Sequence, residues 1–167
     1  MKKHGICTLM YLILAAIFFV PLLSTPGCSH QQPQTPPEPS PPSLYERVGG
    51  INNIAPLIDD VIERSYVNEV FHANPRIAEA HKRFPKAVYK FNATALACEV
   101  MGGPQKYTGR TLKEAHQHLK ITEKEWQELI QIFRDSMNSF KVPEKEQNEI
   151  IAILESTKGD IVINKKG

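Results

Sequence analysis

Hydrophobic residues between positions 52 and 161 recur at intervals of three and four, the spacing of one face of an α-helix. The first stripe comprises Ile54, Leu57, Ile58, Val61, Ile62 and Tyr66, with Pro56 expected in the first turn or so of its helix. A second helix is predicted to open at Pro85 and to run to about Met101, where Gly102-Gly103-Pro104 stops it. No segment shows sustained alternation of period two, so the pattern predicts an all-α fold.

Two segments begin with the same helix-start signature, a threonine followed three residues later by a glutamate. Thr111 with Glu114 and Thr122 with Glu125 form predicted capping boxes, in which hydroxyl and carboxylate bind each other's free amides. The second box opens a helix whose apolar face is Trp126, Leu129, Ile130, Phe133, Met137 and Phe140. Pro143 is expected to start the last helix, and Gly159 to stop it. The Thr111 helix has room for barely two turns, so tertiary packing must hold it.

The N-terminal part of the chain has a different pattern. Residues 1–28 combine Lys2 and Lys3, an apolar run over 6–23 and a small-residue break before Cys28, which is typical of a bacterial lipoprotein leader. An uncleaved membrane anchor is the alternative, since about 20 apolar residues span a bilayer. Residues 29–43 form a proline-rich linker. The folding domain is expected over 44–162, with a tail at 163–167, and either leader would hold it outside the cytoplasm at a membrane.

Composition narrows the class of partner. Without Lys2 and Lys3, basic and acidic residues balance at 18 each, which argues against a nucleic-acid partner. Beyond the leader and Cys28 the only cysteine is Cys98, so no internal disulfide or CxxC site is available and a buried hydrophobic role is expected for it.

His116 is the candidate with chemistry. Leu112 and Leu119 lie four residues before and three after it, so the three share one helix face. His118 is about 200° further round a helix and should point away, which excludes a shared metal. Taken alone, an inward histidine is more often a hydrogen-bonded core residue than a ligand.

The surrounding motifs favour a ligand. The order is LYERVGG at 44–50, GGPQKYTGR at 102–110, KEAH at 113–116, IT at 121–122 and VPE at 142–144. In this series the domain resembles the group 1 truncated haemoglobins, globins with a two-over-two helical sandwich. The resemblance implies that His116 is the proximal iron ligand of haem b and that the double glycines are backbone hinges. It also offers Arg110 and Lys113 as partners of the haem propionates, with a solvated helix face as the alternative. Pocket-lining residues, or plain core, would be Leu96, Leu119, Trp126 and Phe133.

The side opposite the proximal histidine departs from the family. Ile62 stands where the ligand-binding tyrosine is usual, and the distal-helix positions hold Tyr89, Asn92 and Ala93. Tyr89 is the first candidate to stabilise bound oxygen and Asn92 the second. About six extra residues fall around 67–84, where Phe71 or Phe84 is the candidate to stack on the haem. His72 and His81 lie in this connection, which leaves a bis-histidine state as an alternative.

The resemblance implies a haem-binding globin that reversibly binds oxygen or another diatomic gas, with nitric oxide or peroxide chemistry available. Turnover would need an external electron donor, because the chain has no flavin or nicotinamide motif. The competing hypothesis is a haem-free helical envelope lipoprotein that acts as an interaction module.

Overall fold

The computed structural model describes residues 40–163, and the predicted leader and most of the linker lie outside that range. All the regular secondary-structure elements within the described residues are helices. These helices are α1 (Leu44–Arg47), α2 (Ile51–Val67), α3 (Glu69–His72), α4 (Pro75–Arg83), α5 (Lys86–Val100), α6 (Leu112–His116), α7 (Glu123–Ser139) and α8 (Glu144–Ile161).

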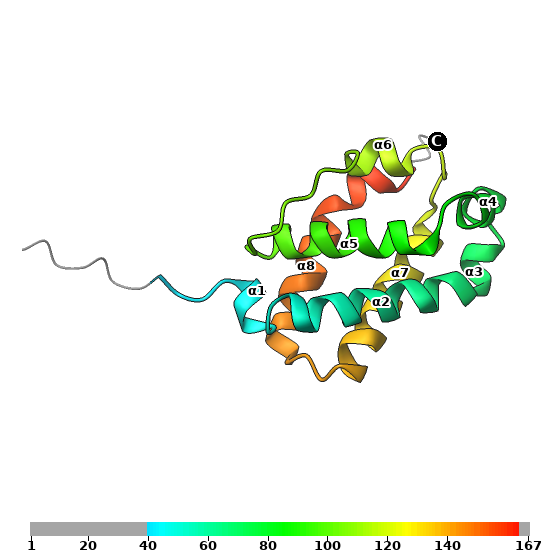
Figure 1. The fold of residues 1–167 in the computed structure, drawn as a ribbon. Coiled ribbons are helices and arrows are strands. Elements are labelled where there is room, and N and C mark those ends of the chain that lie inside the picture. The colour runs from blue at the N-terminus through cyan, green and yellow to red at the C-terminus, as the bar shows by residue number, and fades with distance from the viewer. Residues whose placement is uncertain (1–39, 164–167) are drawn as a thin grey trace, which may run out of the picture. The chain divides into compact units, whose positions relative to one another are not determined.

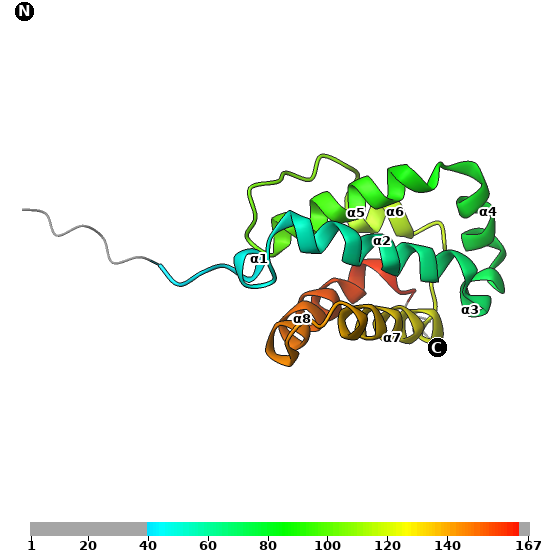
Figure 2. The same ribbon diagram turned by 60° about the horizontal axis from the view of Figure 1, so that its bottom comes forward.

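Four long helices form two layers. α2 packs along α5 in one layer, and α7 packs along α8 in the other, with α2 crossing α7 between them (Figure 1). The view in Figure 2 shows α2 and α5 above α7 and α8, and α6 beside the end of α8. Within residues 40–163 there is no strand, only an isolated bridge between Ile121 and Val162. The all-α prediction and the two-over-two arrangement are confirmed.

Short-range polar bonds fix the helix starts near the site. Both predicted capping boxes are present: the Glu114 amide donates to the Thr111 hydroxyl at 3.3 Å, and the Glu125 amide donates to the Thr122 hydroxyl at 3.4 Å. The second predicted helix is α5, which begins one residue after Pro85. These starts follow from residues three or fewer positions apart, which is why the sequence predicts them.

Two predicted helix details are wrong. α2 begins at Ile51 with Gly50 as N-cap at a φ of +67°, so Pro56 lies in the second turn and not the first. α8 continues through Gly159 to Ile161, because the helix end is set by the packing of Ile161 and Val162 in the core rather than by the glycine. The lesson is that a glycine at a helix end is a weak stop when the next residues are apolar.

Residues 67–84, predicted as a connection, contain two helices. Asn68 caps α3 by accepting from the Val70 amide at 2.9 Å, and Asn74 caps α4 by accepting from the Arg76 amide at 3.0 Å. Pro75 occupies the first turn of α4, where its missing amide costs nothing. These residues therefore build ordered structure beside α2 and α7.

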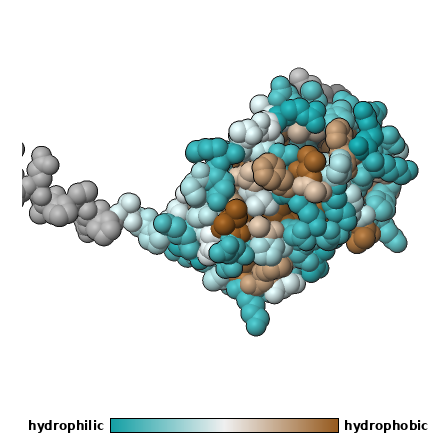
Figure 3. All heavy atoms as spheres, in the orientation of Figure 1, coloured by the Kyte–Doolittle hydropathy of each residue, from teal (hydrophilic) through white to brown (hydrophobic). Residues whose placement is uncertain are grey.

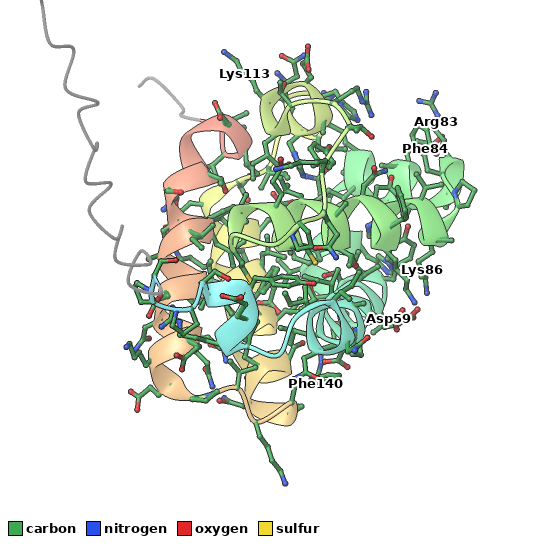
Figure 4. The ribbon with its side chains drawn as sticks, turned by 60° about the vertical axis from the view of Figure 1, so that its left-hand side comes forward. Asp59, Arg83, Phe84, Lys86, Lys113 and Phe140 are labelled. Carbon is green, nitrogen blue, oxygen red and sulfur yellow. The ribbon has the colours of Figure 1, made fainter. Side chains whose placement is uncertain are left out.

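The core lies between the two layers. Trp126, Met137 and Cys98 are completely buried there, which confirms the hydrophobic role expected for Cys98, and burial raises the pKa of its thiol. Phe140, expected on the apolar face of the helix that corresponds to α7, is instead the C-cap of α7 and is 42% exposed (Figure 4). No helix within residues 40–163 is both long and apolar enough to cross a membrane.

Candidate functional site

A cavity of about 680 Å³ lies between the helical layers and α6. Its wall is mostly apolar and comes from α2, α4, α5, α6, α7 and α8, including Val61, Leu96, Leu129, Ile153 and Ile161. A volume of this size is in the range of small-molecule and cofactor sites.

His116 closes one wall of this cavity at the last residue of α6. Its Nδ1 lies 2.7 Å from the carbonyl oxygen of Leu112, one turn earlier. A carbonyl can only accept, so Nδ1 carries the proton and donates it. The neutral ring then has its lone pair on Nε2, the nitrogen on the other side, which makes no hydrogen bond to the described residues.

The surroundings of His116 keep its ring neutral. Burial lowers its pKa below the usual 6.5, and the nearby charges of His118 and Arg110 lower it further, while the bond to Leu112 opposes them. Neutral imidazole is the form that coordinates iron.

Almost every residue predicted for the site lies on the cavity wall. Around His116 the structure brings together Ile62, Tyr89, Asn92, Leu96, Arg110, Leu119, Trp126 and Phe133. Lys113 is the exception: it is exposed, is absent from the wall, and points away from the body of the protein (Figure 4). The proposed propionate contact of Lys113 therefore has no support from its position.

Arg110 is held at the exposed edge of the wall by the loop between α5 and α6. The Tyr107 hydroxyl donates to the Arg110 carbonyl at 2.7 Å, and the Tyr107 amide donates to the Glu99 carboxylate at 2.9 Å. The guanidinium is thereby kept close enough to act on the pKa values of both His116 and Tyr89.

The expectation that His118 faces away from the cavity is wrong. α6 ends at His116, so the rotation of a continuing helix does not apply, and His118 lies among the cavity residues at an exposed position. Its backbone carbonyl accepts from Arg76 Nη1 at 3.4 Å. Within residues 40–163 no three His, Cys, Asp or Glu side chains converge on a metal site.

On the opposite wall the polar candidates are engaged or partly exposed. The Tyr89 hydroxyl donates to the Ala80 carbonyl at 3.2 Å, which ties α5 to α4, and burial raises the pKa of this tyrosine. Both candidate phenylalanines reach the cavity, but Phe71 is 7% exposed and Phe84 43%. His81 lines the cavity and the exposed His72 does not.

The cavity reaches the surface beside α5. Val88 and Phe84 line it and are 47% and 43% exposed. On the face shown in Figure 3, apolar side chains interrupt an otherwise hydrophilic surface. An apolar molecule can therefore enter without the core being opened.

Tyr66 and Glu125 also border the cavity, which the sequence does not indicate. The sequence places Tyr66 only in an apolar stripe and Glu125 only in a capping box. The helical spacing of Ile77, Ala80 and His81 was the available signal that His81 lies on an inward face of α4.

These features fit a haem. A porphyrin is flat and apolar, and its own four nitrogens supply the metal donors that the described residues lack. The chain provides an apolar cavity, a neutral imidazole with a free Nε2 on one wall, and Arg110 at the exposed edge for a propionate. The unpartnered Nε2 of His116 on the cavity wall is the feature that most favours haem.

Comparison with known proteins agrees with this geometry. A family model described as bacterial-like globin matches residues 43–163. No curated protein matches the sequence.

Solved truncated haemoglobins share the fold. The Fe(III) form of the Tetrahymena pyriformis protein is 20% identical with a TM-score of 0.65, covering 74% of this chain and 100% of its own. The 2/2 haemoglobin of a Synechococcus species, with covalently attached haem, is 18% identical with a TM-score of 0.63, covering 72% and 98%. A group II protein from Bacillus anthracis is 19% identical with a TM-score of 0.62, covering 75% and 95%. The chain belongs to the bacterial-like globin family.

Proposed function

We propose that the chain binds haem b in the cavity through Nε2 of His116, and that it reversibly binds oxygen or another diatomic gas there. Globins are haem proteins, and membership of their family makes haem binding the function of this chain. When bound, haem would be held by the imidazole of His116 and would supply an iron that can bind a small gas molecule.

One observation carries the role of His116, the 2.7 Å contact between its Nδ1 and the Leu112 carbonyl. This hydrogen bond fixes the tautomer, sets the plane of the ring and increases the basicity of Nε2. Because the capping box at Thr111 fixes the start of α6, the carbonyl that orients the ring is itself held in place.

Other wall residues keep water out and locate the cofactor. Leu96, Leu119 and Ile62 contribute apolar surface, and Trp126 is completely buried with its indole Nε1 donating to Glu155 at 3.2 Å. Arg110 at the edge is proposed to pair with a propionate. Apolar walls of this kind favour a neutral diatomic ligand over ions.

Titration of the full-length chain with hemin tests the proposal. The expected result is a sharp Soret band that saturates at one haem per chain, and whose ferrous carbon monoxide form is stable. His116→Ala should weaken binding by more than the about 10–100-fold typical of second-sphere changes, and added imidazole should restore the spectrum.

His118→Ala is the matched control, because it removes a neighbouring imidazole without touching Nε2 of His116. Equal losses in the two variants would contradict the assignment. A wild-type chain that gives no Soret band would favour the alternative function, a haem-free helical interaction module.

Turnover of nitric oxide or peroxide is a second candidate activity within the same site. It needs electrons from outside, because no flavin or nicotinamide motif is present in the sequence. Stopped-flow mixing of the oxygenated protein with nitric oxide, with reductant supplied, distinguishes repeated cycling from a single oxidation.

Two finer assignments are also proposals. The GGPQKYTGR and KEAH motifs support placement in group 1 of the truncated haemoglobins. The pattern of residues 1–28 supports a lipoprotein leader with Cys28 acylated, and hence an extracytoplasmic, membrane-tethered domain. Mass spectrometry of the N-terminus of the protein expressed in a bacterial host tests the second.

A further inference from the structure

The polar side chains around the cavity differ in whether they already have a hydrogen-bond partner in the protein. Most of them already have a protein partner: Tyr89 donates to the Ala80 carbonyl, Tyr107 to the Arg110 carbonyl, and Trp126 to Glu155. The same holds for the hydroxyls of Ser65 and Thr157, which donate to backbone carbonyls of their own helices. These groups are satisfied without a ligand.

Two buried polar atoms on the wall have no such partner. Within residues 40–163, the Tyr66 hydroxyl and Nδ1 of His81 are buried and make no hydrogen bond. A buried polar group left without a partner destabilises the folded protein, so such groups are rare unless something outside the chain satisfies them. Both belong to residues that line the cavity, and both atoms are covered by the side chains packed around them.

The Tyr66 ring is held firmly between two neighbours. His81 stacks on it with ring centroids 3.9 Å apart and planes 9° apart, and the Lys86 ammonium lies 4.6 Å from its centroid. Tyr89 meets it edge-on at 6.1 Å. Three helices, α2, α4 and α5, therefore fix the direction of one free hydroxyl.

We propose that the Tyr66 hydroxyl is the hydrogen-bond donor to the small ligand in this cavity, and that His81 is the positioning residue that holds the tyrosine ring. The proposal rests on the proposed haem function and replaces the role that the sequence predicts for Tyr89. The ligand is a small hydrogen-bond acceptor such as a diatomic gas. Tyr66 lies one helical turn after Ile62, whose side chain cannot donate.

The chemistry of the two groups separates their roles. A phenol keeps its proton at neutral pH, and burial raises the pKa of Tyr66 further, so it can always donate. Burial, followed by the nearby charges of His72 and Lys86, lowers the pKa of His81. The imidazole is therefore neutral, and it packs on the phenol ring without placing a second positive charge beside the Lys86 ammonium.

The vibrational spectrum of the carbon monoxide complex tests this assignment in the haem-loaded, full-length protein. A nearby donor lowers the C–O stretching frequency. Tyr66→Phe keeps the ring and removes only the donor, so the band should rise and oxygen should dissociate about tenfold faster, the effect of one hydrogen bond. Tyr89→Phe is the matched control and should leave the band in place.

The role of His81 requires a separate pair of variants. His81→Ala removes the stacked ring and should broaden or split the band as Tyr66 gains freedom, whereas His81→Phe keeps a stacking ring and should restore a single narrow band. If His81→Phe behaves like His81→Ala, the imidazole itself contacts the ligand and the positioning role is wrong.

The outcomes separate this proposal from the one on which it rests. A normal Soret band with an unmoved C–O band in Tyr66→Phe, or a shift seen only in Tyr89→Phe, overturns the assignment of Tyr66 alone. A wild-type chain that takes up no haem overturns both proposals.

Discussion

The two walls of the cavity are built by different kinds of interaction. On the α6 wall the decisive hydrogen bonds join residues that are close in sequence, Thr111 with Glu114 and Leu112 with His116. On the opposite wall the contacts join distant residues, such as Tyr66 with His81 and Tyr89 with Ala80. The wall proposed to hold the cofactor is therefore encoded locally, and the wall proposed to face the ligand depends on tertiary packing.

The segment between α2 and α5 supplies the long-range contacts of this second wall. Phe71 and Ile77 from α3 and α4 are buried in a cluster with Val61 and Ile132, separate from the main core. The segment thereby brings His81 onto the cavity wall.

The largest expected effect comes from replacing Trp126, a completely buried residue that also lines the cavity. Trp126→Ala should lower the free energy of unfolding by about 3–5 kcal/mol, because it empties a completely buried site and leaves Glu155 without its donor. Urea unfolding of the haem-free chain measures it. Phe91→Ala, which truncates an aromatic residue that is 72% exposed, should cost far less; similar costs for the two would show that Trp126 is not central to the core.

The two capping boxes provide the sharpest comparison within the α6 wall. Thr111→Ala and Thr122→Ala should each cost about 1 kcal/mol of unfolding free energy, since each removes the same cap. Only the first helix carries His116, so only Thr111→Ala should also weaken hemin binding in a titration. A matching loss of haem affinity in Thr122→Ala would show that local order of α6 does not position the histidine.

Variants of Arg110 and Lys113 compare a side chain on the cavity edge with one that points away from the protein. Arg110→Ala should weaken haem binding severalfold, within the about 0–1 kcal/mol typical of an exposed ion pair. Lys113→Ala should leave the affinity unchanged, because its side chain is absent from the wall. Competition with apomyoglobin for hemin measures both, and a larger effect for Lys113 would reverse the assignment.

The smallest expected effect is a change in the free energy of unfolding at acidic pH. Hydrogen bonds from the Thr111 side chain and backbone lower the pKa of Glu114 below its usual 4.5. A carboxyl with a depressed pKa stabilises the folded state above that value, and the contribution is lost as the pH falls through its folded pKa. Chemical unfolding between pH 5 and pH 3 should show the stability difference between wild type and Thr111→Ala shrinking; a constant difference would exclude the carboxylate from the cap.

Much of the fold could be predicted because its signals are local. The capping boxes, the proline near the start of α5 and the apolar stripes each depend on neighbours within one or two turns. α3 and α4 also had such signals, in Asn68 and in Asn74 followed by Pro75. Each of these helices is short, so a cap signal alone does not distinguish it from a connection.

The site could be predicted on one wall only. His116 follows from its helix face and its motif, and the structure adds the Leu112 bond that selects the tautomer. The stacking of His81 on Tyr66 joins two helices whose relative placement no local pattern gives. The hydrogen bond from the Tyr89 hydroxyl to the Ala80 carbonyl cannot be predicted from the sequence either, since it depends on where α4 packs against α5.

The bond between His116 and iron is the central claim, and resonance Raman spectroscopy of the reduced, haem-loaded chain tests it most directly. We predict an iron–histidine stretching band in wild type and in His118→Ala, its loss in His116→Gly, and its return when imidazole is added to that variant. An unchanged band in His116→Gly without imidazole would contradict the account.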